Sequence, residues 1–209
     1  DFIAIQRQQP RLAIINRTVP GLDENCFSVD HHVGGKLAAQ ALLSHGHRRF
    51  AVIAGPESAF DNVCRLDGFF AVLGERGIAR DSVPLLDGGF SFAGGWAAIT
   101  DFIARGVEFT GLFCANDEMA TGALSCLQEH GIRVPQDVSV VGYDNTVMAG
   151  FTSPRLTSVA IPMCEMGANG CHWLLNQCFG SDLAVRRRFP IEVAWRASVV
   201  DCRPENLPG

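Results

Sequence analysis

The chain has 209 residues, of which 47% are hydrophobic and 19% charged, and this is enough to bury a sizeable core in one or two lobes. The net charge of −5 excludes the basic surface with which proteins usually bind nucleic acid, at least for this chain by itself. No apolar run has the length of a membrane span, residues 1–10 lack the order of a signal peptide, and the one basic run, Arg186 to Arg188, is typical of an exposed strand edge.

Short apolar runs alternate with longer amphipathic stretches along the chain. Strands are expected at residues 12–15, 27–29, 50–54, 83–86, 111–115, 138–141, 156–161, 189–193 and 197–200. Helices are expected from Asp30 to about Ser44, after a polar loop at 57–62, from Ser91 to Gly106, from Asn116 to Gly131, and from Pro162 to about Gln177. Strands that alternate with helices of this length predict an α/β fold with a parallel, helix-flanked sheet.

Two of these helices have a clear apolar face. The faces are expected to be buried, and they comprise Val33, Leu37, Ala38, Ala41 and Leu42 in the first helix and Val63, Leu66, Phe69, Phe70 and Leu73 in the second.

The segment from Leu112 to Asp144 is the most informative part of the sequence. It predicts a buried strand, a helix capped by Asn116 or Asp117, and a second buried strand after Gly131. Parallel strands joined by a helix end at the same edge of the sheet. Asn116 and Asp144 are therefore expected to emerge side by side at the carboxyl edge, where open α/β sheets bind ligands.

The same segment carries the motif AND-x-MA-x-G followed by G-I-x-VP-x-D-V-S-V-V-G-Y-D. Residues and spacing closely resemble the lactose/galactose repressor (LacI/GalR) family of bacterial transcription regulators. The resemblance covers roughly residues 10–200. Supporting matches are INR-x-V-PG at 15–21, VD-x-x-x-GG at 29–35, GHRRFAVIAGP at 46–56, CR-x-x-GF at 64–69 and PRLTSV at 154–159.

The resemblance implies a periplasmic-binding-protein-like fold, in which two doubly wound parallel-sheet lobes are joined by three crossing strands. The crossings would fall near Asp30, residues 158–161 and Pro190. A partial N-terminal lobe would comprise residues 1–30 and 161–190, the C-terminal lobe residues 31–160 and 191–203, and a tail residues 204–209. The family's DNA-reading helix-turn-helix, hinge helix and first βα units have no counterpart in this sequence, so the first lobe is expected to be truncated.

Polar side chains follow several of the predicted strands and could bind a sugar together. They are Asp61, Asn62, Arg65, Asn116 and Asp144, with Phe90 as an aromatic ring to stack on the sugar's apolar face. The resemblance implies that Arg65, Phe90, Asn116 and Asp144 line an effector cleft. Asp61 and Asn62 resemble the galactose-repressor branch and favour a sugar over a purine. By the same resemblance, Asn16 and Arg17 would face the cleft from the other lobe.

Each of these residues also has a purely structural interpretation, which spacing alone leaves open. Asn116 could only cap its helix and Asp144 only a turn. Arg65 could only pair with Asp61 one helical turn away. Phe90 could belong to the core.

The resemblance further implies a two-fold dimer contact, formed by the helix at 120–130, the segment at 91–96 and Phe151. The candidate interface residues are Ser91, Trp96, Thr121, Leu124, Ser125, Leu127 and Phe151. The alternative is that this helix only covers its own sheet.

No metal, cofactor or catalytic motif is expected. The histidines His31, His32, His45 and His47 lack zinc-ligand spacing, no CxxC pair occurs, and the glycine pairs fit neither a dinucleotide nor a P-loop pattern. No nucleophile elbow is present. Cys164, Cys171 and Cys178 are spaced by seven and predict a buried helical stripe. Reduced thiols fit a cytoplasmic protein.

Three functional hypotheses follow. The first is the effector-binding and dimerisation core of a transcriptional repressor, which senses a sugar by lobe closure and reaches operator DNA only through a domain absent from this sequence. The second is a transport-linked periplasmic sugar-binding protein of the same fold. The third is an α/β enzyme acting on a sugar or nucleotide, with Asp61 or Asp144 as base.

Overall fold

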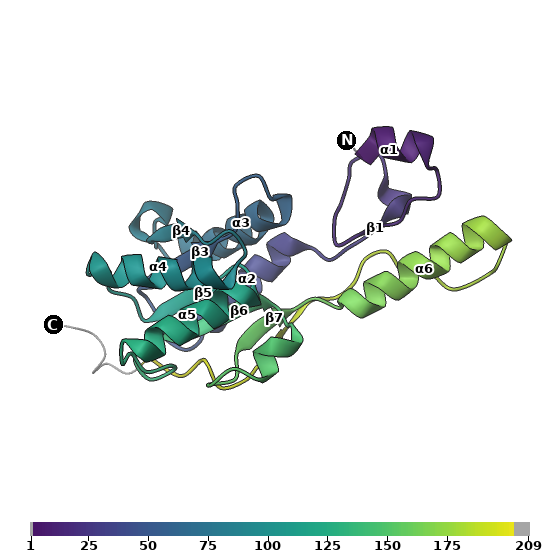
Figure 1. Cartoon of the computed structure of the whole chain (residues 1–209). Coiled ribbons are helices and arrows are strands. Elements are labelled where there is room, and N and C mark those ends of the chain that lie inside the picture. Colours follow the sequence, from purple (N-terminus) through teal and green to yellow (C-terminus); the bar gives the residue numbers. More distant parts are fainter. Residues whose placement is uncertain (1, 203–209) are drawn as a thin grey trace. The chain divides into compact units, whose positions relative to one another are not determined.

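The computed structural model describes residues 2–202 and divides the chain into two compact units (Figure 1). The first unit comprises Asp1–Asp30 and Ile161–Ile191, and the second comprises His31–Ala160 and Glu192–Gly209. The tail expected at 204–209 lies outside the described residues. Within residues 2–202, no helix combines the length and the apolar character that crossing a membrane requires.

The second unit is built on a six-stranded sheet of order β4-β3-β5-β6-β7-β8. The strands are β3 (Phe50–Ala54), β4 (Leu85–Asp87), β5 (Gly111–Cys114), β6 (Ser139–Asp144), β7 (Thr157–Ala160) and β8 (Glu192–Ala194). All neighbouring strands are parallel except β8, which runs antiparallel to β7. Every residue of β3 and β5 is buried, as expected for parallel strands with helices on both faces. The predicted α/β fold with a mostly parallel sheet is confirmed.

Four helices flank this sheet: α2 (His31–Leu43), α3 (Phe60–Glu75), α4 (Phe92–Ala104) and α5 (Asp117–Glu129). Right-handed crossovers place α3 on the face opposite to α4 and α5, and Figure 1 shows this division, with α2 beside α3. Glycines bring the paired helices into backbone contact. A Cβ on Gly35 of α2 would lie 1.9 Å from the carbonyl oxygen of Arg65, and one on Gly122 of α5 would lie 2.0 Å from that of Phe92. Larger side chains at either position would push the helices apart.

The strand order reverses direction at the pair β3 and β5. After β3 the chain crosses one face of the sheet through α3 to reach β4. After β5 it crosses the opposite face through α5 to reach β6 on the other side. The loops after these two strands therefore diverge, and ligands of open α/β sheets bind in the crevice at such a point. This topology fixes where a functional site is to be sought.

The first unit contains α1 (Phe2–Gln8), β1 (Ile14–Ile15), the short 3₁₀ helix η1 (Asp23–Asn25), β2 (Cys26–Phe27) and α6 (Met163–Phe179). β1 and β2 pair in parallel, and Ile14, Leu22 and Cys26 form a small buried cluster. On α6 the buried residues are Met166, Gly170 and Trp173, spaced as one helical face. Cys164, Cys171 and Cys178 are all exposed, so the prediction of a buried cysteine stripe is wrong.

Three other expectations need correction. α3 begins at Phe60, so Asp61 and Asn62 belong to its first turn and not to a loop at 57–62. Val33 and Val63, predicted to be buried, are each 40% exposed, because they stand at the margin of the packed helix faces. Residues 197–200 form no strand. Ser198 instead bonds to two neighbouring strands through its side chain. Its hydroxyl accepts the backbone N–H of Thr157 in β7 and donates to the carbonyl of Val140 in β6.

Candidate functional site

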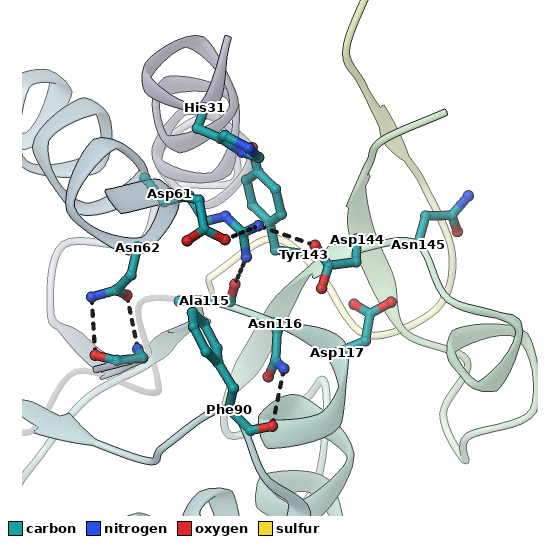
Figure 2. A network of polar contacts seen from close by, with 12 residues as sticks. His31, Asp61, Asn62, Phe90, Ala115, Asn116, Asp117, Tyr143, Asp144 and Asn145 are labelled. Carbon is teal, nitrogen blue, oxygen red and sulfur yellow. Dashed lines mark hydrogen bonds and ion pairs between the residues drawn. The ribbon is translucent and has the colours of Figure 1, made fainter. Parts of the chain in front are cut away.

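Arg65 joins three elements at the carboxyl edge of the sheet, and Figure 2 labels its partners Asp61, Ala115 and Asp144. It lies on α3, and only 2% of its side chain is exposed. Its Nη1 donates to the carbonyl oxygen of Ala115 at the end of β5. Its Nη2 donates to Asp61 Oδ2 at 3.0 Å and forms an ion pair with Asp144 Oδ1 at 3.3 Å, at the end of β6. One guanidinium thus holds two carboxylates over the point where the strand order reverses.

Two aromatic rings flank the guanidinium. The Cζ atom of Arg65 lies 4.0 Å from the ring centroid of Tyr143 and 5.9 Å from that of Phe90. Cation–π attraction of this kind is strengthened where water is excluded. The hydroxyl of Tyr143 lies 3.0 Å from His31 Nδ1, which ties the ring to α2. Sequence reasoning missed Tyr143, the only tyrosine of the chain, because the strand predicted from the sequence ends at residue 141, whereas β6 continues to Asp144 and buries Tyr143.

Asp61 and Asp144 are the accessible members of the cluster, with 30% and 24% of their side chains exposed. Burial raises the pKa of Asp144 to about 7, Arg65 opposes this rise, and the negative charges of Asp117, Asp61 and Glu118 add to it. The site therefore places more carboxylates than cations near Asp144. Such a site suits a ligand that donates hydrogen bonds and disfavours an anionic one.

Asn62, predicted to contact an effector, uses its side-chain amide for hydrogen bonds within the protein. It is 1% exposed. Its Oδ1 accepts the backbone N–H of Gly55 at 2.8 Å, and its Nδ2 donates to the carbonyl oxygens of Gly55 at 2.9 Å and Pro56 at 3.3 Å. The prediction for Asn62 is wrong, because its amide closes the turn between β3 and α3 and has no face left for a ligand.

Asn116 caps α5 and also fixes the loop after β4. Its Oδ1 accepts the backbone N–H of Met119 at 2.9 Å, and its Nδ2 donates to the carbonyl of Phe90 at 3.3 Å. Phe90 has a φ of 54°, and its ring covers Gly55 so closely that a Cβ there would lie 2.2 Å from the ring. The capping interpretation of Asn116 is confirmed, and effector contact by Asn116 and Phe90 stays a prediction.

Asp117, the next residue along the chain, is a further buried carboxylate that sequence reasoning used only as a possible helix cap. Burial raises its pKa, while hydrogen bonds from Ser158 and Thr146 oppose the rise. Its partners lie on β7 and on the loop after β6, so it connects α5 to both. An acidic residue before an apolar helical stretch predicts a cap, but nothing in the local pattern predicts these distant partners.

Two further predicted residues belong to the first unit. Asn16, at the end of β1 with a φ of 59°, and Arg17, whose guanidinium lies 5.2 Å from the ring of Phe2, belong to the first unit. Their contact with an effector stays a prediction. Within the part of the chain that the structure describes, no group of three or more His, Cys, Asp or Glu side chains is arranged to hold a metal ion.

The predicted dimer residues divide into buried and accessible ones. Leu127 is completely buried in its own unit, so it cannot contact a second copy and the prediction is wrong for this residue. Leu124 is almost completely buried as well. Phe151 is 79% exposed and Ser125 is exposed, while Ser91, Trp96 and Thr121 are partly exposed. These accessible residues lie on α4, α5 and the loop after the 3₁₀ helix η3 (Val147–Gly150).

Comparisons with known proteins agree with this architecture. Residues 39–199 match the family model described as the periplasmic binding protein-like domain. The chain is 34% identical over 175 residues to the HTH-type transcriptional regulator GalR of Escherichia coli (strain K12). The aligned region covers 84% of this chain and 51% of that protein. The chain thus spans about half the length of the curated relatives it matches.

Solved structures show the same likeness. A transcriptional regulator of the LacI family from Burkhoderia phymatum superimposes with a TM-score of 0.92 at 49% identity, covering 95% of this chain and 72% of that one. A LacI family transcriptional regulator from Enterococcus faecium, solved with bound ribose, gives a TM-score of 0.84 at 29% identity, covering 95% of this chain and 74% of that one.

Proposed function

Because the chain belongs to the LacI family of transcriptional regulators, within the periplasmic-binding-protein-like fold, we propose that it is the effector-binding core of a repressor that senses a neutral sugar. The observation that carries this proposal is the pair Asp61 and Asp144, both part-exposed and both held by the buried guanidinium of Arg65. Two fixed carboxylates at a sheet edge can accept hydrogen bonds from neighbouring sugar hydroxyls in defined directions.

The charge of the site favours a sugar over the anionic alternatives. Phosphorylated sugars and nucleotides would bring negative charge beside Asp61 and Asp144, which share the single guanidinium of Arg65. Phe90 and Tyr143 supply apolar surface at the same edge. The relative from Enterococcus faecium binds ribose, which supports a free sugar as ligand.

Sensing would operate through a change in the arrangement of the two units. A sugar that binds one arrangement better shifts the population toward it, and a linked DNA-reading segment responds to that shift. The chain itself carries a net charge of −5 and is not expected to bind duplex DNA at physiological salt. Operator binding therefore belongs to another segment of the whole protein, which acts in the cytoplasm.

Calorimetric titration of the full-length gene product with D-galactose, D-ribose and a purine base tests the proposal. A sugar should bind, the purine should not, and the sugar should be recovered unchanged, since a regulator binds its effector without turnover. Binding should weaken in Asp144→Ala and persist in Asp137→Asn, which alters a carboxylate bonded only to Arg133. Absence of sugar binding, or turnover of the sugar, would contradict the proposal.

We further propose that the full-length protein is a two-fold dimer through α4, α5 and η3. Exposed apolar side chains support this: Val147, Met148 and Phe151 are 80%, 50% and 79% exposed and lie within five residues of the chain. Phe151→Glu and Ser125→Glu should each yield monomers by light scattering, because they place a charge in the contact without touching the core. A dimer mass retained in both variants would exclude this surface.

A further inference from the structure

Asp117 uses both of its carboxylate oxygens on the segment that follows β6. Oδ2 accepts hydrogen bonds from the backbone N–H of Thr146 at 2.6 Å and from its Oγ1 at 3.1 Å. Oδ1 accepts the hydroxyl of Ser158 on β7 at 2.6 Å. The residue is 1% exposed, so no ligand reaches this carboxylate directly. Both carboxylate oxygens of Asp117 are therefore used to bind Thr146 and Ser158 within the protein.

The segment held in this way has an unusual backbone. Asp144 and Asn145 both have positive φ values, 98° and 53°, which non-glycine residues seldom adopt. Such conformations persist only where surrounding contacts enforce them. Ser158 supplies one such contact, since its Oγ accepts the backbone N–H of Asn145 at 3.0 Å. Arg196 supplies another, through a 2.6 Å hydrogen bond from Nη2 to Asn145 Oδ1.

The consequence of this turn is the direction of Asp144. Because the chain turns sharply at residues 144 and 145, the Asp144 carboxylate reaches Nη2 of Arg65 at 3.3 Å (Figure 2). If the turn relaxed to ordinary negative φ values, the Cα–Cβ direction of Asp144 would change. The ion pair with Arg65 would then be lost.

We propose that Asp117 is a positioning residue for effector binding: its hydrogen bonds to Thr146 and Ser158 enforce the strained turn that aims Asp144 at Arg65 and at the ligand. This inference rests on the proposed function for its effect on affinity. The alternative is that Asp117 only stabilises the fold, as an acidic residue in the first turn of α5 does in general.

Amide hydrogen exchange tests the turn without any ligand. Asp117→Asn leaves one acceptor oxygen where the carboxylate has two, so the side chain can no longer accept from Thr146 and Ser158 together, and the turn is held less firmly. We expect the amides of Asn145 and Thr146 to exchange about tenfold faster or more, with β5 amides unchanged. Ser158→Ala, a milder change, should accelerate Asn145 in the same direction. Asp137→Asn is the matched control, because this aspartate accepts hydrogen bonds from Arg133 and precedes the opposite end of β6.

A double-mutant cycle tests the link to binding. With the sugar that binds among D-galactose and D-ribose, Asp117→Asn should weaken affinity about tenfold in the wild-type background. It should have almost no further effect in Asp144→Ala, because the side chain that it positions is then gone. Additive effects on affinity, or unchanged exchange at Asn145 and Thr146 in both variants, would overturn the inference. If neither sugar binds the wild type, the proposed function fails, and the exchange rates alone decide whether Asp117 enforces the turn.

Discussion

Two sets of polar side chains lie at the carboxyl edge of the same sheet. They differ in how far they are buried and in how many of their hydrogen-bonding atoms are already paired within the protein. The outer carboxylates, Asp61 and Asp144, are part-exposed and share the guanidinium of Arg65. The inner polar residues, Asn62, Asn116 and Asp117, are 1%, 8% and 1% exposed and bond to backbone or to neighbouring side chains. Residue type and position after a strand are alike in both groups. Burial and existing partners separate the two carboxylates that we propose to contact the ligand from the residues that hold the loops.

Arg65 stands between the two groups and belongs to neither. It is as buried as the inner residues, yet two of its partners are the outer carboxylates. Its guanidinium also reaches the carbonyl of Ala115, where β5 ends. We infer that Arg65 orders the outer carboxylates before a ligand arrives, which lowers the entropy that binding must remove.

Removing Arg65 should produce the largest effect, because this residue contacts both outer carboxylates and is itself buried. Arg65→Ala leaves Asp61 and Asp144 without their shared cation and empties the space against the ring of Tyr143. Breaking a buried ion pair by removing one partner costs about 3–5 kcal/mol. We expect a loss of that order in the free energy of unfolding, measured with urea, together with loss of sugar binding. Arg133→Ala, which breaks an exposed pair with Asp137, should leave both unchanged.

The adjacent residues Asp61 and Asn62 offer the sharpest test of the difference between the groups. Asn62→Ala leaves the backbone N–H and carbonyl of Gly55 unpaired in a buried turn. At about 1–3 kcal/mol for each unsatisfied group, unfolding by urea should shift clearly. Asp61→Ala, one position earlier, should weaken sugar affinity while changing stability little. Equal effects of the two substitutions on stability would remove the distinction between outer and inner residues.

Among the outer carboxylates, Asp144 should contribute most to affinity. Charge-assisted hydrogen bonds are stabilising by about 1.5–3 kcal/mol, so Asp144→Ala should weaken sugar binding by about ten- to a hundredfold. Asp144→Asn should cost less, because the amide keeps one acceptor oxygen. Calorimetric titration gives both values, and unchanged affinity in Asp144→Ala would place the ligand elsewhere.

The sequence predicted the fold well because the fold depends on periodicity. Buried strands such as Phe50–Ala54 and the caps at Ser91 and Asn116 depend on near neighbours in the chain, and the structure shows them as expected. Side-chain roles were harder to predict. Asp61 and Asn62 differ by one position, and only the true start of α3 at Phe60 decides which of them faces the turn. The exposed cysteines of α6 show the same limit, since spacing identifies a common helix face but not which face is buried.

Contacts between distant segments were beyond sequence reasoning. Tyr143 beneath Arg65 is separated from it by 78 positions of chain, and the partners of Asp117 lie on a loop and a strand that fold back to α5. A buried tyrosine in a strand and an aspartate at a helix start both have ordinary local explanations. Their second role arises only when the sheet order β3-β5-β6-β7 brings the strand ends together.

The pH dependence should be the smallest effect, and at Asp144 affinity and stability should change with pH in opposite directions. The pKa of Asp144 is raised from 3.8 to about 7, chiefly by burial, and a sugar hydroxyl bonds best to its ionised form. Affinity should therefore rise with pH up to about 7 and then level off, falling below it by at most about tenfold per pH unit.

Stability should move the opposite way. Between about pH 4 and 7 the folded chain holds a proton on Asp144 that the unfolded chain has released, so the free energy of unfolding falls as pH rises through this range. Asp144→Asn, which cannot titrate, should flatten the affinity profile and reduce the slope of stability with pH. The raised pKa of Asp117 contributes a stability slope of the same sign, and Asp144→Asn leaves that part in place. Parallel titrations of affinity and urea stability from pH 5 to 8 measure both slopes. An affinity that rises as pH falls would mean that the sugar binds beside a protonated Asp144, and the acceptor role of this carboxylate would have to be abandoned.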